Sequence, residues 1–167
     1  VGQALEGGAT TLVGVWQRAP LQALARLHAL AAADLVDEQL LGRPRQDPEV
    51  SPRLDLVTRL VTGASAAPAP VLAAVVHGEL LTLAPFGSGD GVIARGVSRL
   101  VTIATGLDPH GLGVPEVYWL RRAEEYRTAA AGFATGTPEG LGPWLLMCCR
   151  ALEDGAREAV SIAEAAG

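Results

Sequence analysis

The residues with the clearest chemical potential lie in one glycine-rich segment, from Gly87 to Gly91, that is followed by Arg95. A glycine-rich turn at the start of a helix exposes free backbone N–H groups and the positive end of the helix dipole, and both attract anions. One turn into such a helix, the guanidinium group of Arg95 can reach an oxygen of the same anion. The spacing therefore predicts a phosphate site made of Gly87, Ser88, Gly89, Asp90, Gly91 and Arg95.

Two helices are expected to hold this turn between them. The apolar stretch from about Pro70 to Leu83 has helical length, and a proline suits the first helical turn. After the turn, apolar residues recur at helical spacing from about Gly91 to Thr105. One whole face of this second segment is apolar, so we expect it to be central; the face comprises Ile93, Val97, Leu100, Val101 and Ala104.

Four more helical segments complete the pattern, and strand signals are almost absent. They are expected at about Pro20 to Asp37, at about Pro52 to Val61, from Pro115 through Phe133, and from Pro143 onward, with a break at Thr135 to Gly142. We therefore predict an all-α helical bundle in which two central helices flank the glycine-rich turn. Residues 1–18 are expected to form an N-terminal segment and residues 19–167 the helical domain.

Composition limits the function classes. The chain has 167 residues, enough for one core, and a formal net charge of −5. Without a basic face to displace counterions from phosphates, it is not expected to bind nucleic acid, and no stretch predicts membrane binding. Cys148 and Cys149 are adjacent within an apolar run, so we expect core residues rather than a disulfide or a metal site, and a cytoplasmic location.

The segment around the turn resembles the signature of the Fic family. That signature reads His-Pro-Phe-x-[Asp/Glu]-Gly-Asn-Gly-Arg-x-x-Arg and lies between two central helices. Weaker similarity around His77, Trp119 and Trp144 extends the resemblance over most of the chain from Pro20 onward. The resemblance implies a Fic-like bundle and a nucleotide such as ATP as ligand. The signature positions that match in type and spacing are Pro85, Phe86, Gly89, Gly91 and Arg95.

Four functional side chains of the Fic signature are replaced in this chain. Ala84 stands where the family has the histidine that deprotonates the target hydroxyl, and a methyl group cannot accept a proton. Ser88 replaces the acidic ligand of Mg²⁺ and is a much weaker ligand for a hard cation. Asp90 replaces the asparagine with a charge that repels phosphate, and Val92 replaces the first arginine. We therefore expect no catalytic residue and no metal site in this segment.

The expected function is that of a degenerate Fic protein without AMP-transfer activity, acting as a nucleotide- or phosphate-binding scaffold or as a scaffold for a partner protein. The alternative is an active Fic-type adenylyltransferase or phosphotransferase that uses another base. His77 lies two turns before Ala84 and is a candidate for that base, although we expect it to hydrogen-bond within the bundle. His28 is expected to be a satisfied core residue because it shares a helix face with Leu21 and Leu24.

The resemblance also implies an inhibitory pair. Many Fic proteins carry a helix, [Ser/Thr]-x-x-x-Glu-[Gly/Asn], whose glutamate pairs with the last arginine of the signature. Residues 2–7 fit this pattern except at the first position, so Glu6 and Arg95 would be the pair. Two alternatives remain: Arg95 pairs with Asp90 while Glu6 is solvated, and Asp90 caps the helix after the turn.

A dinucleotide-binding interpretation is weaker. Gly89 to Ala94 satisfies G-x-G-x-x-A, and Asp108 lies at about the right distance to hold a ribose. That motif requires a strand before the turn, whereas the segment before Pro85 has helical length. Asp108 also lies in a loop rather than at the end of a strand, so we disfavour this interpretation.

Overall fold

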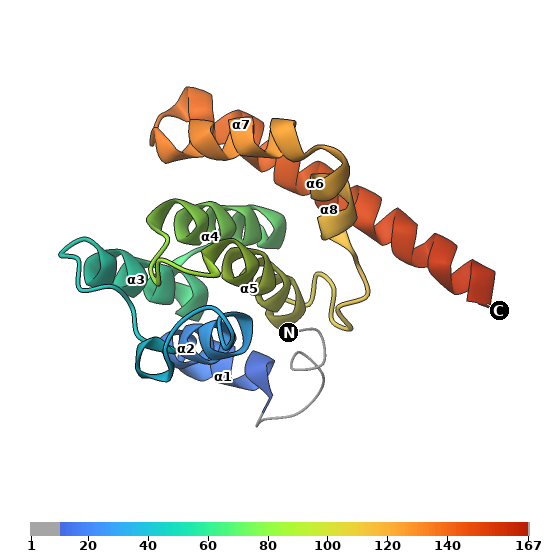
Figure 1. Ribbon diagram of the computed structural model, residues 1–167. Coiled ribbons are helices and arrows are strands. Elements are labelled where there is room, and N and C mark those ends of the chain that lie inside the picture. The colour runs from blue at the N-terminus through green and yellow to red at the C-terminus, as the bar shows by residue number, and fades with distance from the viewer. Residues whose placement is uncertain (1–10, 167) are drawn as a thin grey trace.

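The computed structural model describes residues 11–166 and is all-helical, with eight α-helices and no strand in that range. This confirms the predicted all-α class. The helices are α1 (Leu12–Arg18), α2 (Pro20–Ala31), α3 (Val50–Arg59), α4 (Ala69–Leu83), α5 (Asp90–Ala104), α6 (Pro115–Arg121), α7 (Ala123–Ala134) and α8 (Pro138–Ala166) (Figure 1).

Helices α4 and α5 form the centre and make the most extensive helix–helix contact in the described chain. Proline begins the first turn of α4, where its missing N–H group costs nothing. On α5, an apolar face buries Ile93, Val97 and Leu100. The glycine-rich turn connects the two helices, so the prediction that two central helices flank it is correct.

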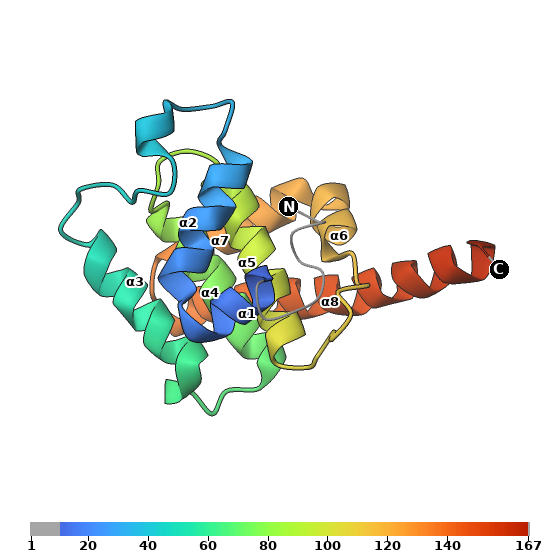
Figure 2. The same cartoon turned by 90° about the horizontal axis from the view of Figure 1, so that it is seen from below.

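The other helices lie on two sides of this central pair. Helices α1, α2 and α3 lie on one side, and α6, α7 and α8 lie on the other (Figures 1 and 2). The first group shares a core with α4 and α5 that includes Trp16, Leu24 and Val57. The second group forms an aromatic core around Trp144, whose indole N–H donates to the carbonyl oxygen of Ala74 at 2.8 Å.

Several helix boundaries differ from those expected. A short helix, α1, was not predicted, although Leu12, Val15 and Trp16 are buried along it. Helix α2 ends at Ala31 rather than near Asp37, because most residues of the next segment are exposed and have no core to cover.

The C-terminal helices differ as well. The helix expected from Pro115 through Phe133 is broken at Arg122, where φ is −123° and ψ is 41°, so that two shorter helices pack on α8. Helix α8 begins at Pro138 instead of Pro143, since the Thr137 hydroxyl accepts the N–H of Gly140 in its first turn.

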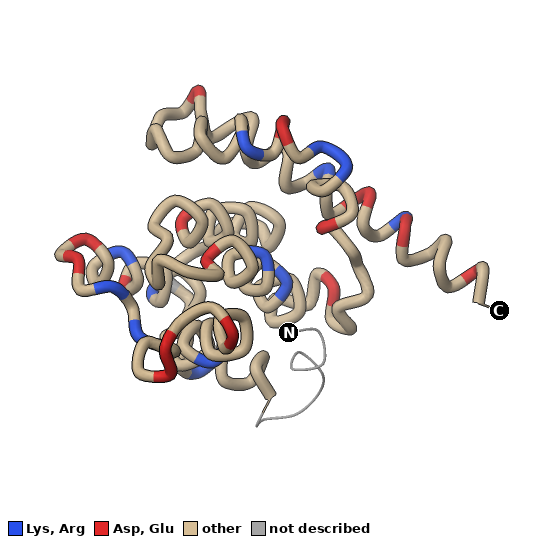
Figure 3. The backbone as a smooth tube through the Cα atoms, in the orientation of Figure 1, with Lys and Arg blue, Asp and Glu red and all other residues tan. Residues whose placement is uncertain are grey.

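Charged residues of both signs are intermixed along the described chain, without a stretch of arginines (Figure 3). Within residues 11–166, none of the helices combines the length and the apolar character needed to cross a bilayer.

Candidate functional site

The turn between α4 and α5 is built from residues in left-handed backbone conformations. Ala84 ends α4 with a φ of +44°, while Gly87 and Gly89 have φ values of +73° and +65°. Glycine adopts this region freely, whereas an alanine there costs roughly 1–2 kcal/mol. Gly89 caps α5, since its carbonyl oxygen accepts the N–H groups of Val92 and Ile93. The turn therefore places its backbone N–H groups before α5, as an anion site requires.

The carboxylate of Asp90 is bonded to the backbone at the beginning of the turn. Its Oδ1 accepts the backbone N–H of Phe86 at 2.9 Å, closing the turn from within. Burial raises the pKa of the Asp90 carboxyl, against the opposite effect of the N–H groups of Phe86 and Gly87. Asp90 is the first residue of α5 and Gly89 its cap, so the alternative in which Asp90 caps the helix is wrong. An incoming phosphate would meet the negative charge of this carboxylate at the start of α5.

Arg45 holds the other side of the turn. Its Nε donates to the carbonyl oxygen of Ala84 at 2.9 Å, and its Nη2 donates to that of Leu83 at 3.0 Å. The backbone N–H of Arg45 also donates to the carbonyl oxygen of Pro85 at 2.7 Å. The guanidinium thus satisfies the last carbonyl groups of α4 and supports the left-handed Ala84. Nothing in the sequence indicated this role, because Arg45 lies in an aperiodic loop far from its partners along the chain.

His28 and Ser88 meet at the turn, a contact that the sequence spacing does not reveal. The His28 ring stacks on Phe86 with centroids 4.3 Å apart, and its Nε2 lies 3.0 Å from the Ser88 hydroxyl oxygen. Its Nδ1 accepts the backbone N–H of Gly42 at 2.8 Å. Neutral histidine with an accepting Nδ1 must carry its proton on Nε2, so it donates to Ser88 and cannot deprotonate it. His28 is a satisfied core residue, as predicted, and not a general base.

Arg95 extends from α5 to a buried aromatic network. It hydrogen-bonds to the Tyr126 hydroxyl, which in turn lies 2.9 Å from Nε2 of His77. His77 is fully buried, and burial, with the charge of Arg95, lowers its pKa to about 3. The predicted hydrogen bond of His77 within the bundle is confirmed. Since the ring has no exposed surface, His77 cannot reach a substrate as the replacement base.

Arg95 nevertheless stays close to the turn. A Cβ atom built on Gly91 would lie 3.4 Å from Nη1 of Arg95. Among residues 11–166, Arg95 forms no ion pair, so the alternative pairing with Asp90 is absent. Glu6 lies outside the described residues, and so does the predicted inhibitory pair of Glu6 and Arg95.

The structure therefore brings together all of the residues predicted for the phosphate site, but the side chains of Ser88 and Asp90 are bonded within the protein. The Ser88 hydroxyl is bonded to His28, and Ala84 offers no side-chain donor or acceptor. Over the described part of the chain, no group of three or more histidine, cysteine or acidic side chains is arranged to hold a metal ion. Cys148 is buried, as predicted, and Cys149 is partly buried. The hydrogen bonds of Asp90, Arg45 and His28 therefore stabilise the turn.

No protein-family model, no curated protein and no solved structure matches this chain.

Proposed function

We propose that this chain is a degenerate Fic-like protein that does not transfer AMP and acts as a scaffold for a partner protein. The observation that carries this proposal is the hydrogen bond from the Phe86 N–H to the Asp90 carboxylate. This bond closes the turn between α4 and α5 from within and holds a carboxylate, which repels phosphate, at the start of α5. Of the two scaffold roles expected from the sequence, binding a partner is therefore favoured over binding a nucleotide.

The surroundings of the turn support the same proposal. General-base catalysis needs an accepting group near the substrate, and it typically contributes a factor of roughly 10²–10⁴ in rate. His28 has its Nδ1 bound and its Nε2 protonated, and His77 is sealed among aromatic rings. The Arg45 guanidinium is bonded to backbone carbonyl groups and to Asp47 at 3.2 Å, so it is not free to clamp a phosphate.

Calorimetry with ATP, ADP and GDP, each with and without Mg²⁺, tests this proposal. We expect no binding heat with any of these nucleotides. A parallel incubation with radiolabelled ATP is expected to leave both this chain and added proteins unlabelled. Tight, Mg²⁺-dependent nucleotide binding, or ATP-dependent labelling abolished by Arg95→Ala, would instead establish the alternative enzyme and end the scaffold proposal.

A further inference from the structure

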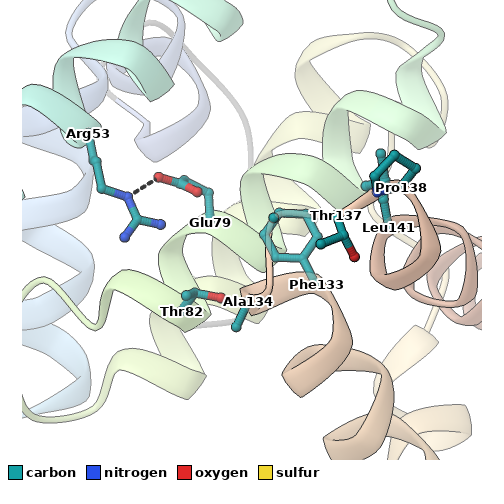
Figure 4. A pocket seen from close by; sticks show the side chains of 9 residues that line it. Arg53, Glu79, Thr82, Phe133, Ala134, Thr137, Pro138 and Leu141 are labelled. Carbon is teal, nitrogen blue, oxygen red and sulfur yellow. Dashed lines mark hydrogen bonds and ion pairs between the residues drawn. The ribbon is translucent and has the colours of Figure 1, made fainter.

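A pocket separate from the signature turn lies between α3, α4 and the corner that joins α7 to α8 (Figure 4). It has a volume of about 350 Å³, within the range of small-ligand sites. Arg53 of α3 forms one wall, while Glu79 and Thr82, one turn apart on α4, form the floor. The opposite wall is mostly apolar and is formed by Phe133, Ala134, Gly136, Thr137, Pro138 and Leu141.

The charged side of the pocket has an ion pair with an unused acceptor. Arg53 Nε donates to Oε1 of Glu79 at 2.6 Å, and Nη1 of Arg53 lies 3.9 Å from Oε2 of Glu49. Glu49 does not line the pocket, whose charged side chains are Arg53 and Glu79. Only 17 % of the Glu79 side chain is exposed. Within residues 11–166, neither Oε2 of Glu79 nor the Thr82 hydroxyl has a hydrogen-bond partner, and neither of them is a fully buried atom.

Two further features of the pocket favour a cation. Phe133 and Ala134 end α7, so this wall lies at the negative end of a helix dipole. The Phe133 ring beside Glu79 offers the aromatic surface that attracts ammonium groups (Figure 4). The N-terminal end of α8 has the opposite, positive dipole charge, but it already has partners. The Thr137 hydroxyl accepts the N–H of Gly140 at 3.2 Å, and the carboxylate of Glu139 lies in the first turn.

We propose that this pocket binds an aliphatic ammonium group. The ammonium donates hydrogen bonds to Oε2 of Glu79 and to the hydroxyl oxygen of Thr82, while its alkyl chain lies along Phe133, Pro138 and Leu141. Binding uses the second oxygen of Glu79 and leaves its ion pair with Arg53 intact. The group can belong to a free alkylamine or to a lysine side chain of another polypeptide. The two sources share this chemistry and differ only in the group at the far end of the alkyl chain.

NMR titration of the full chain with three probes tests the proposal. We expect 1,5-diaminopentane and a blocked Gly-Lys-Gly peptide to shift the amide resonances of Thr82, Phe133 and Leu141, and hexanoate to leave them unchanged. The amine probe with the lower Kd shows whether the pocket prefers a free alkylamine or a lysine side chain. Glu79→Gln keeps an acceptor for Arg53 but removes the charge, so the Kd of the amines should rise roughly tenfold or more.

Two matched variants complete the design. Thr82→Val removes one acceptor at an exposed position and should raise the Kd severalfold. Glu164→Gln lowers the charge of the chain by the same amount on an exposed part of α8 and should leave the Kd unchanged. The proposal is wrong if hexanoate shifts these resonances, if neither amine does, or if Glu79→Gln and Glu164→Gln have equal effects. This outcome is independent of nucleotide binding at the turn.

Discussion

A single carboxylate sets the character of the turn between α4 and α5. Asp90 accepts a backbone N–H at 2.9 Å, and its pKa is raised because burial outweighs the hydrogen bonds it receives. For an acid, a raised folded-state pKa means that the ionised form is less favourable in the folded protein than in the unfolded chain. The negative charge is therefore not required for folding, although it excludes other anions.

Asp90→Asn should make the turn an anion site. The asparagine can still accept the Phe86 N–H through its side-chain oxygen, but it no longer repels phosphate. We expect weak binding of ADP to appear in calorimetry, and the free energy of unfolding at pH 7 to change by no more than about 1 kcal/mol. Asp55→Asn, at an exposed position of α3, serves as the charge-matched control. If Asp90→Asn binds no more ADP than the unmodified chain does, something other than this carboxylate closes the site.

His77 should make the protein sensitive to acid. Its pKa is lowered to about 3 in the folded state, mainly by burial, from an ordinary value of 6.5. Between these values the unfolded chain takes up a proton that the folded protein does not. Stability is therefore lost as the pH falls below 6.5, by ~1.4 kcal/mol per pH unit from this group alone.

Urea denaturation between pH 7 and 5 measures this slope. His77→Gln keeps a partner for Tyr126 but cannot be protonated, and it should remove ~1.4 kcal/mol per pH unit from the pH dependence. A smaller slope of the same sign remains from His28, whose pKa burial also lowers. Asp90 acts in the opposite direction, since its raised pKa favours the folded state as the pH falls. An unchanged slope in His77→Gln would mean that His77 is protonated inside the fold.

At the level of the helices, Gly78 permits the close approach of α4 to α7 and α8. A Cβ atom at this position would lie 2.7 Å from the Trp144 indole nitrogen and 2.8 Å from the Phe133 ring. Trp144 is constrained, since it is fully buried and bonded to Ala74, and Phe133 packs against it. Neither ring can move without disturbing the aromatic core.

Gly78→Ala should therefore destabilise the protein, although alanine favours helix formation. Overpacking typically costs about 1–3 kcal/mol, against a gain in helix propensity of roughly 1 kcal/mol. Gly142→Ala is the matched control, because it lies in α8 and a Cβ there meets no atom within 4 Å. In chemical denaturation we expect Gly142→Ala to stabilise and Gly78→Ala to destabilise. An equal increase in the free energy of unfolding in both variants would show that Trp144 and Phe133 repack freely.

Across the whole molecule, the two side groups of helices meet through α4 and α5, and α8 extends beyond both of them. Gly155 is the last buried residue of α8, packed against the chain before Pro115. The side chains from Val160 to Ala166 are exposed, and Figure 2 shows this end projecting from the bundle. These last turns consequently have no tertiary contact to stabilise them in the described chain.

Truncation after Ala159 should leave the fold intact. The deleted residues bury little apolar surface, so we expect the melting temperature to fall by no more than a few degrees. Circular dichroism measures both the melting temperature and the small loss of helical signal. Truncation before Gly155 removes the contact with Pro115 and serves as the destabilised reference. A large drop in the melting temperature after truncation at Ala159 would indicate that the projecting end of α8 makes stabilising contacts in solution.

The amino-acid sequence by itself determined the helical class and the place of the turn. Helical periodicity and proline at helix starts are local signals, and they locate α4 and α5 to within about one residue. Glycines at Gly87 and Gly89 likewise indicate a turn, since left-handed backbone is a property of single residues. The absence of a side-chain base at Ala84 also follows from the sequence alone.

Only the tertiary structure decided what the turn is bonded to. Arg45 and His28 come from segments far along the chain, and neither has a local pattern that indicates its contact with Ala84 or Ser88. The pocket between Arg53, Glu79 and Phe133 likewise depends on three helices meeting. Such contacts arise from packing between distant segments, and no periodicity within one segment encodes them.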